Sequence, residues 1–220
     1  MSRLILASAS PRRRELLRAE GVVFEVEPAN VDETLQGSPT PEEAARELAL
    51  RKVTHAHVTA MADGHDGSSD RWILAADTVV GLPPRGAGEP WRLLAKAADE
   101  DEAREMLGSL SESRHEVVTG VAVARLRAGE PNAEIRVVAE TTVVAMRAIA
   151  ADELDAYVAS GEWRDKAGAY AIQETADRFV TELVGGGFDN VVGLPVKRTL
   201  RLLESMGWSR DSVAEDPSAG

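Results

Sequence analysis

The chain opens with a short apolar run, a polar turn and a capped helix, a unit that strongly favours an α/β fold. Residues 4–7 (Leu-Ile-Leu-Ala) are typical of a short buried strand. Ser8-Ala9-Ser10 supplies the turn and a candidate N-cap, and Pro11 takes the first position of a helix expected to run to about Glu20. Backbone N–H groups and the positive end of the helix dipole meet at such a turn, which therefore also favours phosphate binding.

Strand-like and helix-like patterns continue to alternate along the chain. The expected strands cover residues 22–26, 72–80, 116–126, 135–149 and 178–184, the expected helices cover 41–62, 99–110, 152–160 and 195–206, and loops are expected at 61–71 and 83–90. The helix that starts at Pro41 is well marked, because Thr40 and Glu43 form a capping box. We therefore expect one α/β domain over residues 1–208 and a flexible acidic tail over residues 209–220.

Composition excludes several classes of protein. Hydrophobic residues make up 44% of the chain and aromatic residues only 4%, so Ala, Val and Leu must form the core. There is no cysteine, which removes disulfides, Cys-based zinc sites and thiol nucleophiles. A net charge of −12 argues against a nucleic-acid partner. No apolar run approaches the roughly 20 residues of a membrane span and no signal peptide is evident, so we expect a cytoplasmic protein that does not bind membranes.

An anionic substrate would need a local cluster of positive charge in such an acidic chain. Arg12, Arg13 and Arg14 open the first helix, and Arg18 follows one turn later. Guanidinium groups at a helix N-terminus match phosphate oxygens well. A solvated basic helix face is the equally simple alternative.

Lys52 is unusual because it lies within the apolar stripe of its helix, four residues after Leu48. Its aliphatic stem could pass the core and leave the ammonium in water, or the ammonium could reach a cleft and bind phosphate. The sequence leaves both possibilities open.

Asp77 interrupts the apolar strand at residues 72–80, where a carboxylate is costly unless it is paired or bound to a metal. At a strand end that faces a ligand crevice, it would ligate Mg²⁺ or accept a proton from water. Asp32 and Glu33 are candidates for a second oxygen ligand.

Two other kinds of site lack their sequence patterns. His55, His57, His65 and His115 show no His-Glu-x-x-His pattern, so we expect them at the surface or in caps. No Gly-x-Ser-x-Gly turn supports a serine nucleophile.

Three segments together resemble the Maf family of nucleotide pyrophosphatases. They are residues 6–13 (Leu-Ala-Ser-Ala-Ser-Pro-Arg-Arg), 76–78 (Ala-Asp-Thr) and 165–173 (Asp-Lys-Ala-Gly-Ala-Tyr-Ala-Ile-Gln). Further matches are Glu33, Lys52, Lys96, residues 115–120 and residues 190–195, so the resemblance spans residues 3–203. It implies a fold similar to inosine triphosphate pyrophosphatase, with a mixed twisted sheet, flanking helices and two lobes around a cleft. It also implies a homodimer and attack of water at the α-phosphorus.

The resemblance assigns roles to individual residues. Asp77, Glu33 and Lys52 would be catalytic, and Glu33 and Asp77 would also bind Mg²⁺ or Mn²⁺. The substrate would contact Ser8, Arg12, Arg13, Thr78, Lys96, Lys166 and Gln173. Asp77 would be a base, a metal ligand or both.

Within the family, these motifs resemble those of the subtype that acts on dTTP and UTP. That resemblance implies that Arg12, Thr78 and Gln173 are selectivity positions. The chain departs from the family pattern at Ala97, where proline is usual, and at Glu174, where glycine is usual. The resemblance also implies removal of modified nucleotides and a link to cell-division arrest. Three alternatives stay open: a nucleotide-sensing regulator of division, a 7-methyl-GTP-type pyrophosphatase, and a phosphatase that removes only the γ-phosphate.

Overall fold

The computed structural model describes residues 3–62, 69–130 and 132–210 of the chain. Its elements follow one another as β1 (Arg3–Leu6), α1 (Pro11–Ala19), β2 (Glu25–Val26), α2 (Pro41–Ala62), β3 (Arg71–Leu82), β4 (Arg92–Leu94), α3 (Glu100–Leu110), β5 (Arg114–Leu126), β6 (Glu134–Met146), α4 (Ala151–Ser160), the 3₁₀ helix η1 (Thr175–Phe179), β7 (Val180–Gly185), α5 (Phe188–Val192) and α6 (Val196–Ser205). No helix within those residues is long and apolar enough to cross a membrane. Most of the expected acidic tail, from residue 211 on, and part of the expected loop 61–71 lie outside the described residues.

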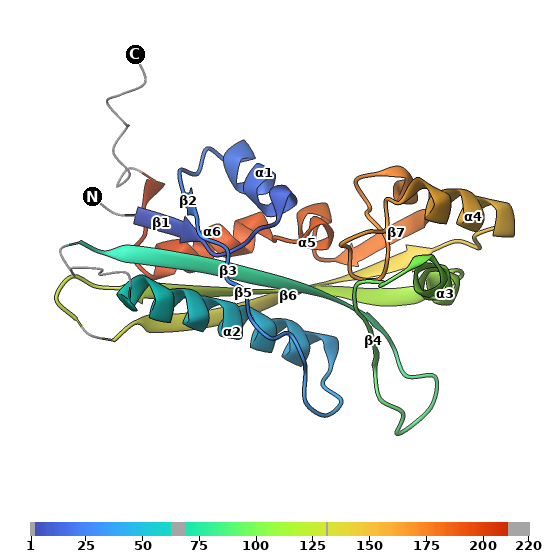
Figure 1. Cartoon of the computed structure of the whole chain (residues 1–220), viewed down its shortest axis with the longest axis horizontal. Helices are drawn as coiled ribbons and strands as arrows, with labels where there is room; N and C mark the ends of the chain where they lie inside the picture. Colours follow the sequence, from blue (N-terminus) through green and yellow to red (C-terminus); the bar gives the residue numbers. More distant parts are fainter. Residues whose placement is uncertain (1–2, 63–68, 131, 211–220) are drawn as a thin grey trace, which may run out of the picture.

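Seven strands form one mixed sheet in the order β2-β1-β3-β5-β6-β7, with β4 also paired to β3. β1 is parallel to β2 and β3, and the other pairs are antiparallel. The long strands β3, β5 and β6 run through the middle of the molecule (Figure 1). The expectation of an α/β fold with a mixed sheet and flanking helices is therefore confirmed.

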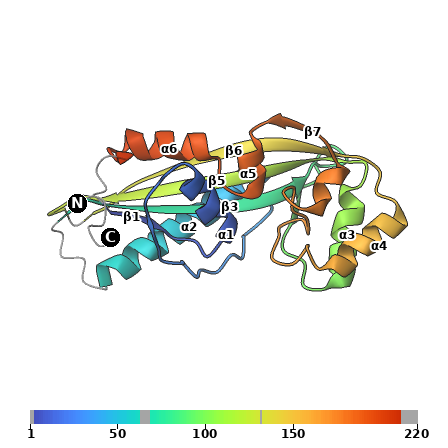
Figure 2. The ribbon, with the colours of Figure 1, turned by 90° about the horizontal axis from the view of Figure 1, so that it is seen from above.

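Helices cover both faces of the sheet, with α2 along one face and α1, α5 and α6 on the other (Figures 1 and 2). Successive side chains of a strand point to opposite faces. Accordingly Ile73 packs in the cluster that contains Val53 of α2, while Leu74 packs in the cluster that contains Leu200 of α6. This alternation decides which helix each residue of β3 can reach.

A separate core lies at the other end of the sheet. Side chains of α3 and α4 pack there with Trp163, Phe179 and Val80 of β3. In Figure 2, α3 and α4 lie beside one another at this end, away from α1 and α6. The long strands thus carry a packed region at each end.

Short elements are where the structure departs from the sequence-based expectations. β4 and α5 were not expected, and the strand expected from residue 178 begins at Val180, because η1 occupies the preceding turn. β6 ends at Met146 rather than at residue 149, next to an irregularity in its pairing with β7. Elements of three to five residues carry too little periodic pattern to be recognised and are fixed by tertiary contacts.

His115 is the histidine for which the surface expectation is wrong. Its side chain on β5 is buried, and its Nε2 lies 2.9 Å from the hydroxyl oxygen of Tyr170. Burial lowers the pKa of His115 to about 4, so the ring is neutral at pH 7. His65 falls outside the described residues, and His55 and His57 are respectively exposed and half-buried.

Close approach of α2 to the sheet depends on Gly120 of β5. A Cβ atom at this position would lie 2.1 Å from the carbonyl oxygen of Ala45, and Ala44, Ala45 and Ala49 of α2 are fully buried. Small residues on both elements let the helix backbone rest directly on the strand, which explains how a chain poor in aromatic residues forms a dense core.

We expect Gly120→Ala to lower the free energy of unfolding by about 2 kcal/mol or more, because the added methyl must push α2 away from β5. Gly108→Ala is the matched control. Gly108 lies on the exposed side of α3 with open space around its Cα, so that variant should gain roughly 0.5 to 1 kcal/mol. Urea unfolding of both variants checks the pair, and equal stabilities would contradict the close approach.

Candidate active site

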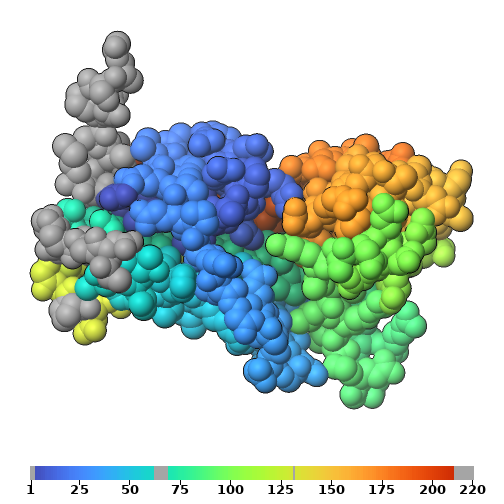
Figure 3. Space-filling view, in the orientation of Figure 1, coloured from blue at the N-terminus to red at the C-terminus, as the bar shows by residue number. Residues whose placement is uncertain are grey.

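The site forms where one edge of β3 changes partners. On this edge β1 pairs with residues 71–74 and β4 with residues 80–82, so among the described residues only β5, on the opposite edge, pairs with residues 75–79. A cavity of about 310 Å³ opens there. Its walls come from α1, α2, β3, β4 and the segment 165–173. In Figure 3 a crease separates the blue N-terminal part from the green and orange part of the surface.

Most of the residues singled out in the sequence meet in this cavity. Its lining includes Arg12, Arg13, Glu33, Lys52, Asp77, Thr78, Lys96, Lys166 and Gln173. Ser8 does not line it, but its Oγ accepts a hydrogen bond from Arg13. Three of the four lysines of the chain are among these residues, although the chain as a whole carries a net charge of −12. The residues to which the resemblance assigns roles are therefore close together in space, whereas Asp32 lies outside the cavity lining and accepts from the backbone N–H of Thr34.

Lys52 connects the two predicted carboxylates. Its Nζ donates a short hydrogen bond to Oδ1 of Asp77 and lies 2.7 Å from Oε1 of Glu33. The side chains of Lys52 and Asp77 are 12% and 11% exposed, while that of Glu33 is 49% exposed. Of the two possibilities that the sequence left open, the ammonium reaches the cavity.

The charge of Lys52 also controls the ionisation of Glu33. Burial by itself raises the pKa of Glu33, but the hydrogen bond from Lys52 and the charges of Lys52, Lys96 and Arg13 outweigh burial and lower that pKa below its ordinary value. Glu33 is therefore a carboxylate at neutral pH and an oxygen ligand or hydrogen-bond acceptor.

Arg13 is held by three anchors from separate parts of the fold. Its Nε donates to the carbonyl oxygen of Gly193 at 2.8 Å, and its two terminal nitrogens donate to Ser8 Oγ and to Thr78 Oγ1, each at 3.2 Å. Ser10 caps α1 by accepting from the backbone N–H of Arg13. A guanidinium has five N–H donors, so two remain for a ligand in a plane already fixed by the protein.

The remaining basic residues differ in exposure and in the groups that they contact. Arg12 and Lys96 line the cavity, half-buried and exposed respectively. Lys166 is buried, donates a short hydrogen bond to the carbonyl oxygen of Glu162 and lies 3.4 Å from Glu174. Glu174, the residue that departs from the family pattern, is thus the counter-ion of Lys166.

Sequence reasoning gave no individual role to three buried polar residues at the site: Thr119, Tyr170 and Asn190. Thr119 Oγ1 lies 3.0 Å from Thr78 Oγ1 and donates to the carbonyl oxygen of Asn190, and Tyr170 lines the cavity. A polar residue within an apolar run, as at Val118-Thr119-Gly120, is the sequence pattern that could have identified such a residue.

The fold and the cavity define a class of protein before any comparison. A mixed sheet with an edge cavity that gathers cations around two carboxylates is typical of proteins that bind a phosphorylated small molecule. Comparison with known proteins then gives the family. Residues 3–206 match the family model described as Maf-like protein, and the chain belongs to the Maf family.

Curated relatives cover nearly the whole chain. The proteins named dTTP/UTP pyrophosphatase from Brucella abortus and Maricaulis maris are 42% and 46% identical, over 94% of this chain and 92% and 89% of their own lengths. The one from Halalkalibacterium halodurans is 40% identical over 95% of this chain and 98% of its own length.

A solved structure titled nucleoside-triphosphatase / dITP/XTP pyrophosphatase, from Mycobacterium abscessus, is 18% identical with a TM-score of 0.33. It covers 69% of this chain and 77% of its own. A likeness at that level adds nothing to the assignment.

We expect Lys52→Met to lower the free energy of unfolding at pH 7 by about 2 kcal/mol, because Asp77 and Glu33 lose their shared counter-ion. Lys197→Met, the same change at an exposed lysine on α6, should stay within about 0.5 kcal/mol. The measurement is denaturant unfolding of both variants beside the unmodified protein.

The difference in stability between the unmodified protein and Lys52→Met should also depend on pH. The pKa of Glu33 is lowered in the folded protein, so its stabilising contribution is present above the ordinary value of 4.5 and lost as the pH falls through the folded value. The gap between the unmodified protein and Lys52→Met should therefore narrow in acid. A gap that is constant from pH 7 to pH 3 would contradict this role of Lys52.

Proposed function

We propose that this protein hydrolyses nucleoside triphosphates, preferably dTTP and UTP, to the nucleoside monophosphate and pyrophosphate. The observation that carries the proposal is the ammonium of Lys52 held between Asp77 and Glu33 at the wall of a cation-lined cavity. Relatives named dTTP/UTP pyrophosphatase, at 40–46% identity over almost the full chain, support it.

The cavity answers the main electrostatic demand of this reaction. A triphosphate carries close to four negative charges, and catalysis of phosphoryl transfer consists largely of positioning and charge stabilisation. Arg12, Arg13, Lys52 and Lys96 supply positive charge from different sides of the cavity. Arg13 is already oriented, so it would not have to be reorganised when phosphate binds.

Asp77 is the candidate base. Its carboxylate is buried on β3 and accepts a hydrogen bond from Lys52, which orients it. In the proposed reaction Asp77 accepts a proton from the attacking water, while Lys52 and Arg13 hold phosphate oxygens.

A divalent metal fits the same pair of carboxylates. Glu33 and Asp77 already share one cationic partner, the ammonium of Lys52, and Mg²⁺ or Mn²⁺, which is commonly bound by one or two carboxylates together with substrate phosphates, would take the place of that ammonium when substrate binds. Among the described residues there is no cluster of three or more His, Cys, Asp or Glu side chains, so phosphate and water would complete the ligand set. When bound, the ion would offset phosphate charge and polarise the attacked group.

Selectivity for the base is proposed to lie with Gln173, at the exposed end of the cavity. Its amide offers one donor and one acceptor edge, which complement the O4 and N3–H edge of uracil and thymine. Arg12 and Thr78 are the other two positions that the resemblance implies.

We further propose that the protein is a homodimer, as the resemblance implies, and that it is cytoplasmic, as the sequence leads us to expect. Sedimentation of the purified protein tests whether it is a homodimer. A role in cell-division arrest stays a prediction of the resemblance.

A panel of UTP, dTTP, CTP and GTP, assayed for pyrophosphate and monophosphate, tests the reaction and the selectivity together. We expect pyrophosphate release, with kcat/KM for UTP and dTTP about tenfold to a hundredfold above that for CTP, because a fixed Gln173 amide would leave cytosine groups unpaired. Orthophosphate alone would indicate a γ-phosphatase. Preference for guanine nucleotides would favour the 7-methyl-GTP type, and binding without turnover a nucleotide sensor.

Asp77→Asn should lower kcat at least about a hundredfold and leave the fold intact, because the amide keeps the shape of the side chain but loses its negative charge. Asp101→Asn, at a side chain that is fully exposed on α3, is the matched control and should retain full activity. Near-normal turnover by a folded Asp77→Asn protein would exclude Asp77 both as base and as required metal ligand.

A further inference from the structure

A line of hydrogen bonds leads from the cavity into the sheet. It runs from a terminal nitrogen of Arg13 to Thr78 Oγ1 at 3.2 Å, on to Thr119 Oγ1 at 3.0 Å, and ends at the carbonyl oxygen of Asn190 at 2.9 Å. Thr78 and Thr119 are opposite one another in the pairing of β3 with β5. The line therefore joins α1, the two central strands and α5.

The chemistry of the two ends fixes the direction of every proton in this line. A guanidinium can only donate, so Thr78 accepts from Arg13. A backbone carbonyl can only accept, so the single hydroxyl proton of Thr119 goes to Asn190. Thr119 then has no proton left for Thr78, and the 3.0 Å contact between the two hydroxyls is a hydrogen bond only if Thr78 donates. The order is Arg13 to Thr78 to Thr119 to Asn190.

The inner end of the line is rigid. Thr119 and Asn190 are fully buried, and Thr119 does not line the cavity. The side-chain amide of Asn190 donates to the carbonyl oxygen of Val117 at 3.0 Å and to Thr142 Oγ1 at 2.9 Å. The end point is thus tied to both β5 and β6, and it holds Thr119 in one orientation.

The outer end is held by the backbone of Gly193. Its carbonyl oxygen accepts from Nε of Arg13 at 2.8 Å, and its φ of 127° is a conformation that favours glycine. This backbone conformation places the acceptor of Arg13 beside α5.

From this ordered line we propose that Thr78 and Thr119 are positioning residues, which orient Arg13 toward the phosphates of the substrate. The proton of Thr78 is committed to Thr119, and one lone pair of its oxygen accepts from Arg13. Thr78 therefore transmits the fixed orientation of Thr119 to the guanidinium group. This inference rests on the proposed triphosphate hydrolysis and adds a positioning role to the selectivity role that the family resemblance implies for Thr78.

Kinetics separate the two roles of Thr78. Phosphates are common to all triphosphates, so loss of Arg13 orientation should lower kcat/KM by the same factor for UTP, dTTP, CTP and GTP. Loss of a base contact should change the ratios among them. We expect Thr78→Val and Thr119→Val, which remove a hydroxyl at nearly constant shape, each to lower all four values about tenfold.

The variants also test whether the two threonines act as one unit. The double variant Thr78→Val/Thr119→Val should lose no more activity than either single variant, since each breaks the same line. Thr78→Ser and Thr119→Ser keep the hydroxyl and should recover activity to within about threefold of the unmodified protein. Thr199→Val, at a buried threonine on α6 whose hydroxyl donates to the carbonyl oxygen of Pro195 in its own turn, is the matched control and should not alter kcat/KM.

A second readout does not require activity. The Nε–H of Arg13 should give a slowly exchanging NMR resonance in the unmodified protein and in Thr199→Val, and a broadened or fast-exchanging one in Thr119→Val. Thr119→Val should remain folded, because the carbonyl oxygen of Asn190 also accepts from the N–H of Gly193 at 3.1 Å; thermal melting checks this, and Thr78→Val provides the same test from the other hydroxyl.

The outcomes distinguish the two proposals. An inactive unmodified protein with the NMR difference intact would overturn the proposed function and support the positioning role. Altered UTP-to-CTP or UTP-to-GTP ratios in Thr78→Val, with Thr119→Val unchanged in activity and in the Arg13 resonance, would overturn the positioning role and leave triphosphate hydrolysis standing.

Discussion

The buried carboxylate of Asp77 is the constraint around which the site is organised. A charge in an apolar strand is costly unless a counter-charge reaches it, and Lys52 of α2 supplies that counter-charge. Lys52 can reach Asp77 only because α2 lies directly on the sheet, which the missing side chain of Gly120 and the alanines of α2 allow. The packing of small residues between α2 and β5 therefore also determines where the charge of Lys52 lies.

The two neighbours on β3, Asp77 and Thr78, serve different parts of the site because they point to opposite faces of the sheet. Asp77 faces α2 and meets Lys52, while Thr78 faces α1 and α5 and meets Arg13. Both reach one cavity because, among the described residues, one edge of β3 has no strand partner between β1 and β4. This gap in pairing brings Asp77, the proposed base, next to Arg13, the proposed phosphate ligand.

Charge is distributed unevenly between the cavity and the rest of the protein. Exposed ion pairs use arginine almost throughout, whereas three of the four lysines lie at the cavity. A compact ammonium fits between two carboxylates, as Lys52 does, while a planar guanidinium suits a site with several fixed acceptors, as for Arg13.

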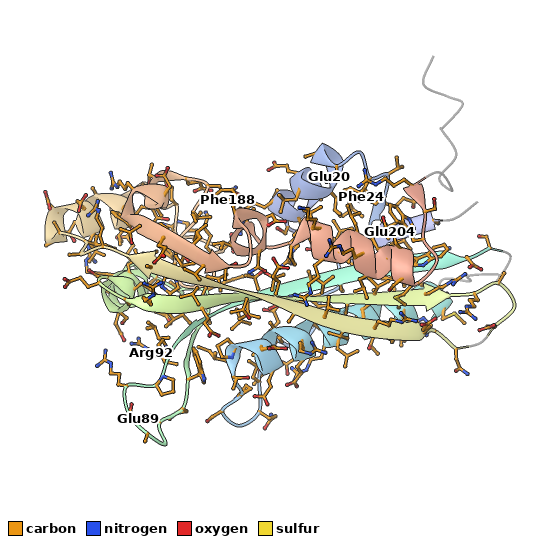
Figure 4. The ribbon with its side chains drawn as sticks, turned by 180° about the vertical axis from the view of Figure 1, so that it is seen from behind. Glu20, Phe24, Glu89, Arg92, Phe188 and Glu204 are labelled. Carbon is orange, nitrogen blue, oxygen red and sulfur yellow. The ribbon has the colours of Figure 1, made fainter. Side chains whose placement is uncertain are left out.

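The connection between β3 and β4 extends away from the sheet. Figure 4 labels Glu89 in this connection and Arg92 at the start of β4. The next residue of β4, Leu93, lines the cavity.

Local patterns in the chain are sufficient to predict the long elements and the residue types at the site. Periodicity and caps predicted α2, α3, β3 and β5, and a carboxylate or lysine in an apolar run marked Asp77 and Lys52, because such exceptions are visible locally. The folded structure was needed to show that Lys52 contacts Asp77, that His115 is buried against Tyr170, and that Lys166 is paired with Glu174. It also decided the proton order from Arg13 to Asn190, since that order depends on four groups from distant parts of the chain meeting at hydrogen-bond distance. Local pattern reports what a residue type requires, and only the packed fold determines which partner meets the requirement.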